Sequence, residues 1–235
     1  MPMQIEKIPT EKQMASEKFD KKRAAMTKNL LRIMNRHSYK NNFVTGICAG
    51  GVLGIMMAML LGYTAGRSPV RDEKGRVVSY ILDKEKATKA MIKIFAVSVL
   101  VCLMAATTQN TSDVRKNRNC ADRLSHDVIK RSTEKALNNL GNVPSVPSET
   151  IITVAQLIIN NMSDKELLRM RIMAQEGLKI DAHGYYNVSD VNVNATTRIV
   201  AECIENNPEL KHNIAMILQG KEPTTWFISR QQKTK

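Results

Sequence analysis

Two long apolar runs divide an otherwise polar chain. The first run, residues 43–66, contains 24 residues and neither a charge nor a proline. At 1.5 Å of rise per residue, a helix of that length spans about 36 Å, whereas the hydrocarbon core of a bilayer is about 30 Å thick. The pattern therefore predicts a transmembrane helix over residues 43–66. A helix buried in the core of a soluble protein is the alternative interpretation.

The second run, residues 90–108, predicts a second transmembrane helix, with the same alternative. Its one charge, Lys93, lies in the first turn, from which the side chain can reach the headgroups. Neither run contains Asp, Glu or His, which argues against a proton relay or an ion-coupled transporter. Residues 67–89 form the loop between the spans. Within it, residues 77–82 predict one short strand or an extended contact segment, and another chain could supply a partner strand.

Small residues recur at every fourth position of the first span: Gly46, Gly50, Gly54, Ala58, Gly62 and Gly66. Such positions form one stripe of a helix, on which a second helix can pack at very short backbone separation. The second span carries a shorter stripe of Ser98, Cys102 and Ala106. Two arrangements fit this glycine-zipper pattern. Either the two stripes face each other in a hairpin, or the glycine stripe packs on another subunit of a homo- or hetero-oligomer.

Residues 1–42 predict a basic amphipathic arm, in which Met26, Leu30 and Met34 recur at helical spacing. A solvated helix or a disordered arm is the alternative. The cations of this arm are candidates for contact with anionic lipid headgroups, at about 1 kcal/mol for each Lys or Arg near the surface. They are Lys21, Lys22, Arg23, Lys28, Arg32 and Arg36.

Three segments are expected after the second span. Residues 109–141 predict a juxtamembrane helix that ends at Gly141, and residues 142–148 predict a linker because they contain two prolines. Residues 149–235 then predict a small helical soluble domain with a polar tail. The fold class expected from the whole pattern is an all-α membrane protein, in which a two-helix transmembrane hairpin carries a small C-terminal helical domain.

Local signals within the C-terminal domain predict four helices. Ser148 is expected to cap the first, Ser163 and Glu166 to form a capping box for the second, and Asn207-Pro208 to begin the last. Residues 178–193 predict an irregular segment with a turn at His183-Gly184. Aromatic side chains in this segment and in the tail are candidates for partner contact, the alternative being that they cover the core of the domain. They are Tyr185, Tyr186, Trp226 and Phe227.

The net charge of +13 comes from 35 Lys and Arg against 22 Asp and Glu. All of it lies within residues 1–135, around the predicted spans, while the last hundred residues are neutral. Lipid headgroups are therefore a better anionic partner than nucleic acid, which is also disfavoured because aromatic residues make up only 4% of the chain. The flanks carry eight Lys and Arg near the spans and the loop carries seven, so this count leaves the orientation open.

Other features favour both termini in the cytoplasm, and a bacterial inner membrane is the expected location. The basic arm has no export signal, and the unpaired-looking Cys120 and Cys203 suit a reducing compartment. No phosphate-binding, metal-protease or nucleophile-elbow motif occurs in the sequence, and the histidines and cysteines lack metal-ligand spacing. We expect no catalytic residue, no metal and no cofactor.

The sequence thus predicts a non-enzymatic integral membrane subunit. Its expected partners are membrane lipids and other membrane-protein subunits, within a scaffold for a multi-protein complex. Subunits of bacterial secretion and conjugation machines and of organelle membrane complexes share this plan at the level of architecture alone. The alternative is a homo-oligomeric protein that forms a pore or remodels the membrane, including an effector that inserts into a membrane.

Overall fold

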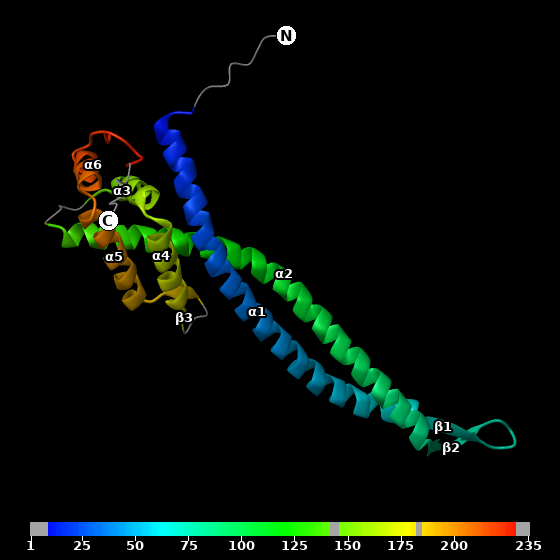
Figure 1. Cartoon of the computed structure of the whole chain (residues 1–235). Coiled ribbons are helices and arrows are strands. Elements are labelled where there is room, and N and C mark those ends of the chain that lie inside the picture. Colours follow the sequence, from blue (N-terminus) through cyan, green and yellow to red (C-terminus); the bar gives the residue numbers. More distant parts are fainter. Residues whose placement is uncertain (1–8, 142–145, 182–184, 229–235) are drawn as a thin grey trace, which may run out of the picture. The chain divides into compact units, whose positions relative to one another are not determined.

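The computed structural model describes residues 9–141, 146–181 and 185–228, most of which are helical (Figure 1). The helices in these ranges are α1 (Glu11–Ala65), α2 (Lys84–Asn139), α3 (Ser148–Asn161), α4 (Asp164–Glu176), α5 (Asp190–Glu205) and α6 (Pro208–Leu218). The strands are β1 (Arg67–Arg71), β2 (Val77–Leu82), β3 (Leu178–Ile180) and β4 (Tyr186–Val188). Both α1 and α2 contain a stretch that is long and apolar enough to cross a membrane.

Contacts divide the chain into two compact units. One unit, here called the helical hairpin, comprises residues 34–117 and holds the second part of α1, the β1–β2 ribbon and the first part of α2. The other, here called the helical domain, comprises the described residues within 1–33 and 118–235. It therefore contains the start of α1 and the end of α2 in addition to α3–α6, and is larger than the domain predicted over 149–235.

The two long helices continue across the positions at which polarity changes. Helix α1 crosses the predicted boundary at residues 42 and 43, and α2 crosses those at 89 and 90 and at 108 and 109. The basic arm and the juxtamembrane segment are thus not separate helices. A change from apolar to polar side chains does not end a helix, because straight-chain polar residues have helix propensities close to those of apolar ones.

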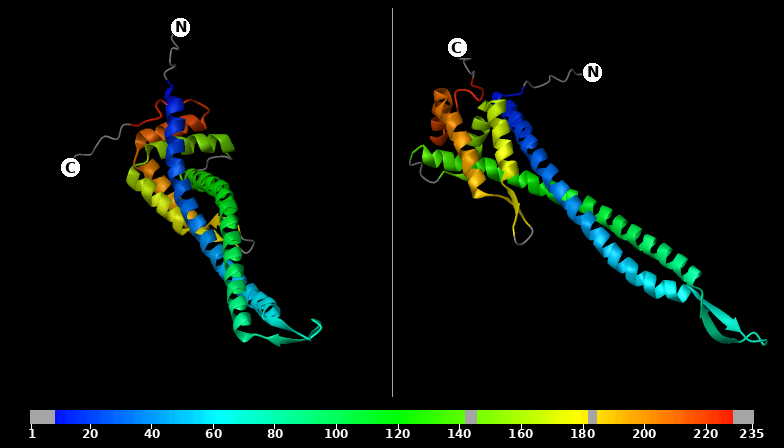
Figure 2. Two further views of the ribbon diagram at one scale, coloured as in Figure 1. Left: turned by 90° about the vertical axis from the view of Figure 1, so that its right-hand side faces the viewer. Right: turned by 60° about the horizontal axis from the view of Figure 1, so that its bottom comes forward.

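Helices α3–α6 pack on the start of α1 and the end of α2 to form the core of the helical domain (Figure 2). The predicted starts of α4 and α6 are confirmed: Ser163 and Glu166 form a capping box, and Asn207 caps α6 with Pro208 in its first turn. The predicted cap by Ser148 is wrong. Pro147 occupies the cap position, and Ser148 is already the first helical residue.

Two antiparallel ribbons depart from the all-α prediction. The segment between the long helices supplies both strands of its own ribbon, β1 and β2, so the prediction of a single strand is wrong. Its turn is built on Asp72, whose Oδ1 accepts the backbone N–H groups of Lys74 (2.9 Å) and Arg76 (2.7 Å), and on Gly75 at a φ of 75°. Strands β3 and β4 pair within the segment predicted to be irregular. The predicted turn at His183-Gly184 lies outside the described residues.

Candidate functional site

The glycine ladder of α1 lies against α2 within the helical hairpin. All six ladder residues, from Gly46 to Gly66, are buried. The residues between them are exposed, except for the half-buried Gly51. Both views of Figure 2 show the two helices side by side as far as the β1–β2 ribbon. Of the two arrangements open to the ladder, the structure therefore shows the hairpin within one chain.

The ladder glycines sit where a side chain would collide with α2. A Cβ atom built on Gly50 would lie 3.0 Å from the Cβ of Cys102 and 3.1 Å from the Cα of Val99. At Gly46 it would lie 3.0 Å from the Cβ of Ala106. These separations are shorter than the ~3.5–4.0 Å of an ordinary carbon contact, so a side chain at either position would require α2 to give way.

The stripe on α2 extends further than the sequence indicated. A Cβ built on Gly54 would lie 2.9 Å from a ring carbon of Phe95, and one on Gly62 would lie 2.2 Å from the Cγ of Met91. Large side chains thus fill the spaces that these glycines leave. Cys102 and Ala106 of the predicted stripe do face the ladder, whereas the hydroxyl of Ser98 donates to the backbone of its own helix, at the carbonyl of Ile94 (2.9 Å).

Polar side chains continue the helix contact beyond the apolar ladder. The Nδ2 atom of Asn42 donates to the Oδ1 of Asn110 (2.9 Å) and to the Oδ2 of Asp113 (2.7 Å). One helical turn further, the Nδ2 atom of the buried Asn117 donates to α1 at Asn35 and Ser38, both at 3.1 Å. Because these bonds have fixed partners, they set the register of α1 against α2. These residues are not among the candidates predicted from the sequence, although Ser38 and Asn42 extend the four-residue spacing of the ladder.

The outward faces of the hairpin helices are apolar and uncovered. Only 22% of the most apolar window of α1 and 6% of that of α2 are buried. A core helix of a soluble protein is mostly buried, so this exposure argues against that alternative. The exposed side chains on α1 include Val52, Leu53, Ile55, Met56, Met59 and Leu60, and those on α2 include Ile92, Val97, Leu100, Val101 and Met104.

Two of the predicted headgroup contacts belong to the helical domain instead. The ammonium of Lys22 donates to the carbonyls of Ile159 (2.8 Å), Asn160 (3.1 Å) and Met162 (3.2 Å), at the C-terminal end of α3. The guanidinium of Arg23 donates to the Oδ1 of Asp122 (3.1 Å).

These contacts are a correction to the sequence-based assignment. A cation beside the last carbonyls of a helix is stabilised by their partial negative charge, so Lys22 has a structural role within the protein. Lys21 is exposed and pairs with Glu17 (2.6 Å). Lys28, Arg32 and Arg36 are exposed, and their contact with lipid stays a prediction.

The C-terminal aromatic residues cover the helical domain, which is the alternative that the sequence left open. Trp226 is only 5% exposed, and its backbone N–H donates to the Oε1 of Glu11 (2.8 Å). The Nζ of Lys18 lies 4.8 Å from the centre of the Phe227 ring, a cation–π distance. The expectation of an exposed anchor is therefore wrong for Trp226. Tyr186 is half-buried, and Tyr185 is 66% exposed.

The attachment of the tail changes the acidity of Glu11. The hydroxyl of Thr225 donates to the Oε1 of Glu11 (2.7 Å), and together with the N–H of Trp226 it stabilises the carboxylate. The pKa of Glu11 is lowered for this reason, the bond from Thr225 being the larger cause.

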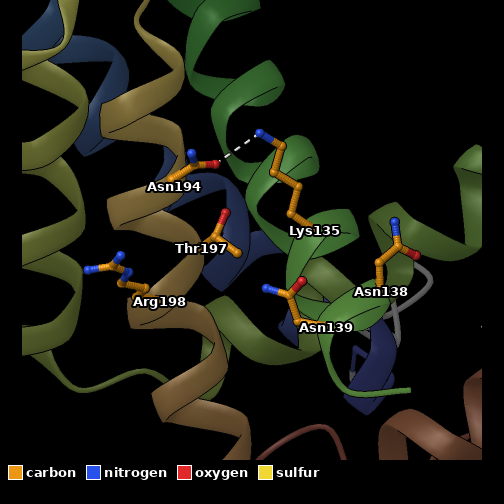
Figure 3. Close-up of a pocket in the computed structure, with 6 residues that line it drawn as sticks. All are labelled: Lys135, Asn138, Asn139, Asn194, Thr197 and Arg198. Carbon is orange, nitrogen blue, oxygen red and sulfur yellow. Dashed lines mark hydrogen bonds between the residues drawn. The ribbon is translucent and has the colours of Figure 1, made fainter. Parts of the chain in front are cut away.

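A polar pocket of about 500 Å³ lies between α2 and α5 in the helical domain (Figure 3). Six side chains line it: Lys135, Asn138, Asn139, Asn194, Thr197 and Arg198. Lys135 donates to the Oδ1 of Asn194 (3.0 Å), the bond drawn in Figure 3. These groups offer amides, a hydroxyl and two cations. Among the residues that the structure describes, no group of three or more His, Cys, Asp or Glu could hold a metal ion.

Comparison of the chain with protein-family models, with curated proteins and with solved structures finds no match. The function must therefore follow from the residues and their geometry. The helical hairpin offers a filled ladder and an uncovered apolar surface, and the helical domain offers a separate folded core.

Proposed function

We propose that this chain is a non-enzymatic integral membrane protein. In this proposal residues 43–66 and 90–108 cross a bilayer as a hairpin, and the helical domain lies in the cytoplasm, where it docks protein partners of a multi-protein membrane complex. A bacterial inner membrane is the location that we propose.

The membrane proposal rests on two features of the helical hairpin. Its helices pack closely along the glycine ladder, and their outward apolar side chains are uncovered. Glycines from Gly46 to Gly66 bring α1 against α2, so the hairpin needs no further helix to fill the ladder. The remaining apolar side chains face outward, and lipid is the solvent that favours such a surface. The backbone of both helices is hydrogen-bonded internally, as a bilayer requires.

The proposed docking role rests on the surface of the helical domain. Several of its large apolar side chains are uncovered, among them Val191 (78% exposed), Tyr185 (66%) and Leu168 (49%). They lie on or beside α4, β4 and α5. Aromatic and aliphatic side chains of this kind act as anchors when a protein partner buries them.

A pore built on the glycine ladder is less favoured. The space along the ladder is filled by Met91, Phe95 and Cys102 of the same chain. A homo-oligomer would have to assemble through the outward faces instead.

Cysteine labelling in intact cells tests the proposal. We would introduce Lys74→Cys in the turn of the β1–β2 ribbon, or Val191→Cys in the helical domain, and apply a membrane-impermeant maleimide before and after lysis. The proposal predicts that the cysteine at position 74 is labelled in intact cells and the one at 191 only after lysis. The membrane proposal fails if alkaline carbonate extracts the protein from membranes. Labelling only at position 191 in intact cells would instead reverse the proposed orientation.

A further inference from the structure

The β1–β2 ribbon exposes apolar side chains on both faces. In β2 the exposed fractions are 68% for Val78, 62% for Tyr80 and 63% for Ile81. A two-stranded ribbon has no core of its own, and the ribbon therefore needs a surface to cover these side chains.

The pairing register separates the residues of the ribbon into two faces. Tyr80 pairs with Pro69, and Leu82 pairs with Arg67, so these four residues share a face, while Val78 lies at a bulge where the register shifts. The opposite face carries Ser79 opposite Val70 and Ile81 opposite Ser68. The first face, here called the Tyr80 face, thus combines three apolar residues with one cation, whereas two serines interrupt the opposite face.

The Tyr80 face begins directly where the apolar helices end. Helix α1 ends at Ala65, and the N–H of Asp83 donates to the carbonyl of Gly66 (3.0 Å), which closes the base of the ribbon on the last turn of α1. The guanidinium of Arg67 lies over the ring of Tyr63, with its carbon 4.6 Å from the ring centre. Tyrosine and arginine at the end of an apolar helix are typical of the membrane–water interface.

The charge around the ribbon matches the same surface. Residues 67–89 carry seven Lys and Arg against four Asp and Glu. Residues 71–76 at the tip carry three of these cations and two of the acids, and residues 83–89 at the base carry three cations and two acids. The segment is therefore net cationic from base to tip, as contact with anionic headgroups requires.

From these observations we propose that the β1–β2 ribbon is an interfacial lipid-binding element. Its Tyr80 face enters the headgroup and upper acyl region of the leaflet at the ribbon end of the hairpin, and the neighbouring Lys and Arg side chains contact anionic headgroups. This inference rests on the proposed membrane hairpin. The chemistry required of the lipid is an anionic headgroup above an apolar layer.

Tryptophan quenching in vesicles tests the inference. The full-length protein would be reconstituted in phosphatidylcholine and phosphatidylglycerol, with or without bromine on the upper acyl carbons of the phosphatidylcholine. Three variants are compared: Tyr80→Trp on the proposed lipid face, Ser79→Trp on the opposite face, and Leu60→Trp on the exposed side of α1. The native Trp226 is buried in the helical domain and gives the same background in each.

We expect brominated lipid to quench the emission added at positions 80 and 60 and to leave that at 79 largely unchanged. Quenching at position 80 should also weaken when phosphatidylglycerol is omitted. If position 60 is quenched and position 80 remains open to aqueous iodide, the ribbon is free in water and available to a protein strand, which overturns the inference alone. If no position is quenched, the membrane hairpin itself is wrong. Equal quenching at 79 and 80 overturns the assignment of the lipid-facing side.

Discussion

Adjacent glycines in α1 provide a matched test of the ladder. A Cβ on Gly50 would lie 3.1 Å from the Cα of Val99, whereas a Cβ on Gly51 would meet nothing within 4 Å. Ordinary carbon contacts lie at ~3.5–4.0 Å, so in Gly50→Ala the neighbouring atoms of α2 must give way by a few tenths of an ångström. That displacement weakens the close contacts along the interface. We expect Gly50→Ala to destabilise the hairpin by about 1–3 kcal/mol, the usual cost of overpacking.

Alkylation of Cys102 measures this separation. The Sγ of Cys102 would lie 3.6 Å from a Cβ on Gly50, so the added methyl shields the sulfur if the helices stay in place. Faster alkylation can therefore arise only from helix separation. A loss of 1–3 kcal/mol raises the open population by roughly 5- to 150-fold, and the alkylation rate in mild detergent should rise by that factor. Mass spectrometry distinguishes Cys102 from the other cysteines.

Gly51→Ala is the control for Gly50→Ala. Both substitutions replace glycine by alanine one residue apart in the same helix, so their effects on helix propensity are alike. Gly51→Ala should leave the rate unchanged or slow it. Equal rates in the two variants would refute the ladder as the contact that holds α1 against α2.

Three further predictions concern side-chain contacts, two within the helical domain and one within the hairpin. Lys22→Met removes the cation from three carbonyls of α3 and should lower the free energy of unfolding of the helical domain by about 1–3 kcal/mol in urea titration, whereas Lys21→Met should have almost no effect; equal losses would contradict the capping role. The pKa of Glu11 is lowered from 4.5, so its contribution to stability is complete above about pH 4.5 and is lost as the pH falls through the lowered pKa. The emission of Trp226 should report this loss, and Glu11→Gln should remove that part of the pH dependence; an unchanged pH profile in this variant would contradict the attachment. Asn117→Ala should speed Cys102 alkylation by roughly 5- to 30-fold, because about 1–2 kcal/mol of hydrogen bonding to α1 is lost, and an unchanged rate would show that these bonds do not hold the helices together.

Periodicity made the ladder readable from the sequence. The four-residue spacing from Gly46 to Gly66 forms one inclined stripe on an α-helix, and the structure buries every member of it. Only some of the α2 residues that contact the ladder could be predicted from the sequence. Cys102 and Ala106 are small and repeat the pattern, but Met91 and Phe95 are large and break it. A search for small residues finds the hollow side of such an interface and misses the side chains that fill it.

Local signals similarly account for the helix starts in the helical domain. The capping box at Ser163 and the Asn207-Pro208 pair depend on neighbours three residues away, and both are confirmed. The roles of Lys22 and Trp226 depend on partners more than 130 residues away in the chain. Such contacts leave no pattern in the neighbouring sequence. A basic residue that caps a helix therefore cannot be distinguished by sequence from one that binds lipid.

The most direct test of the central claim is oxidation of Gly50→Cys in native membranes. The Cβ at this position would lie 3.0 Å from that of Cys102, close to the ~3.5–4.5 Å of a disulfide. If the ladder closes a hairpin within one chain, the product is a cross-linked monomer, and Gly51→Cys gives none. A disulfide-linked dimer from Gly50→Cys, absent in the wild type, would show that the ladder faces another subunit and would contradict the hairpin.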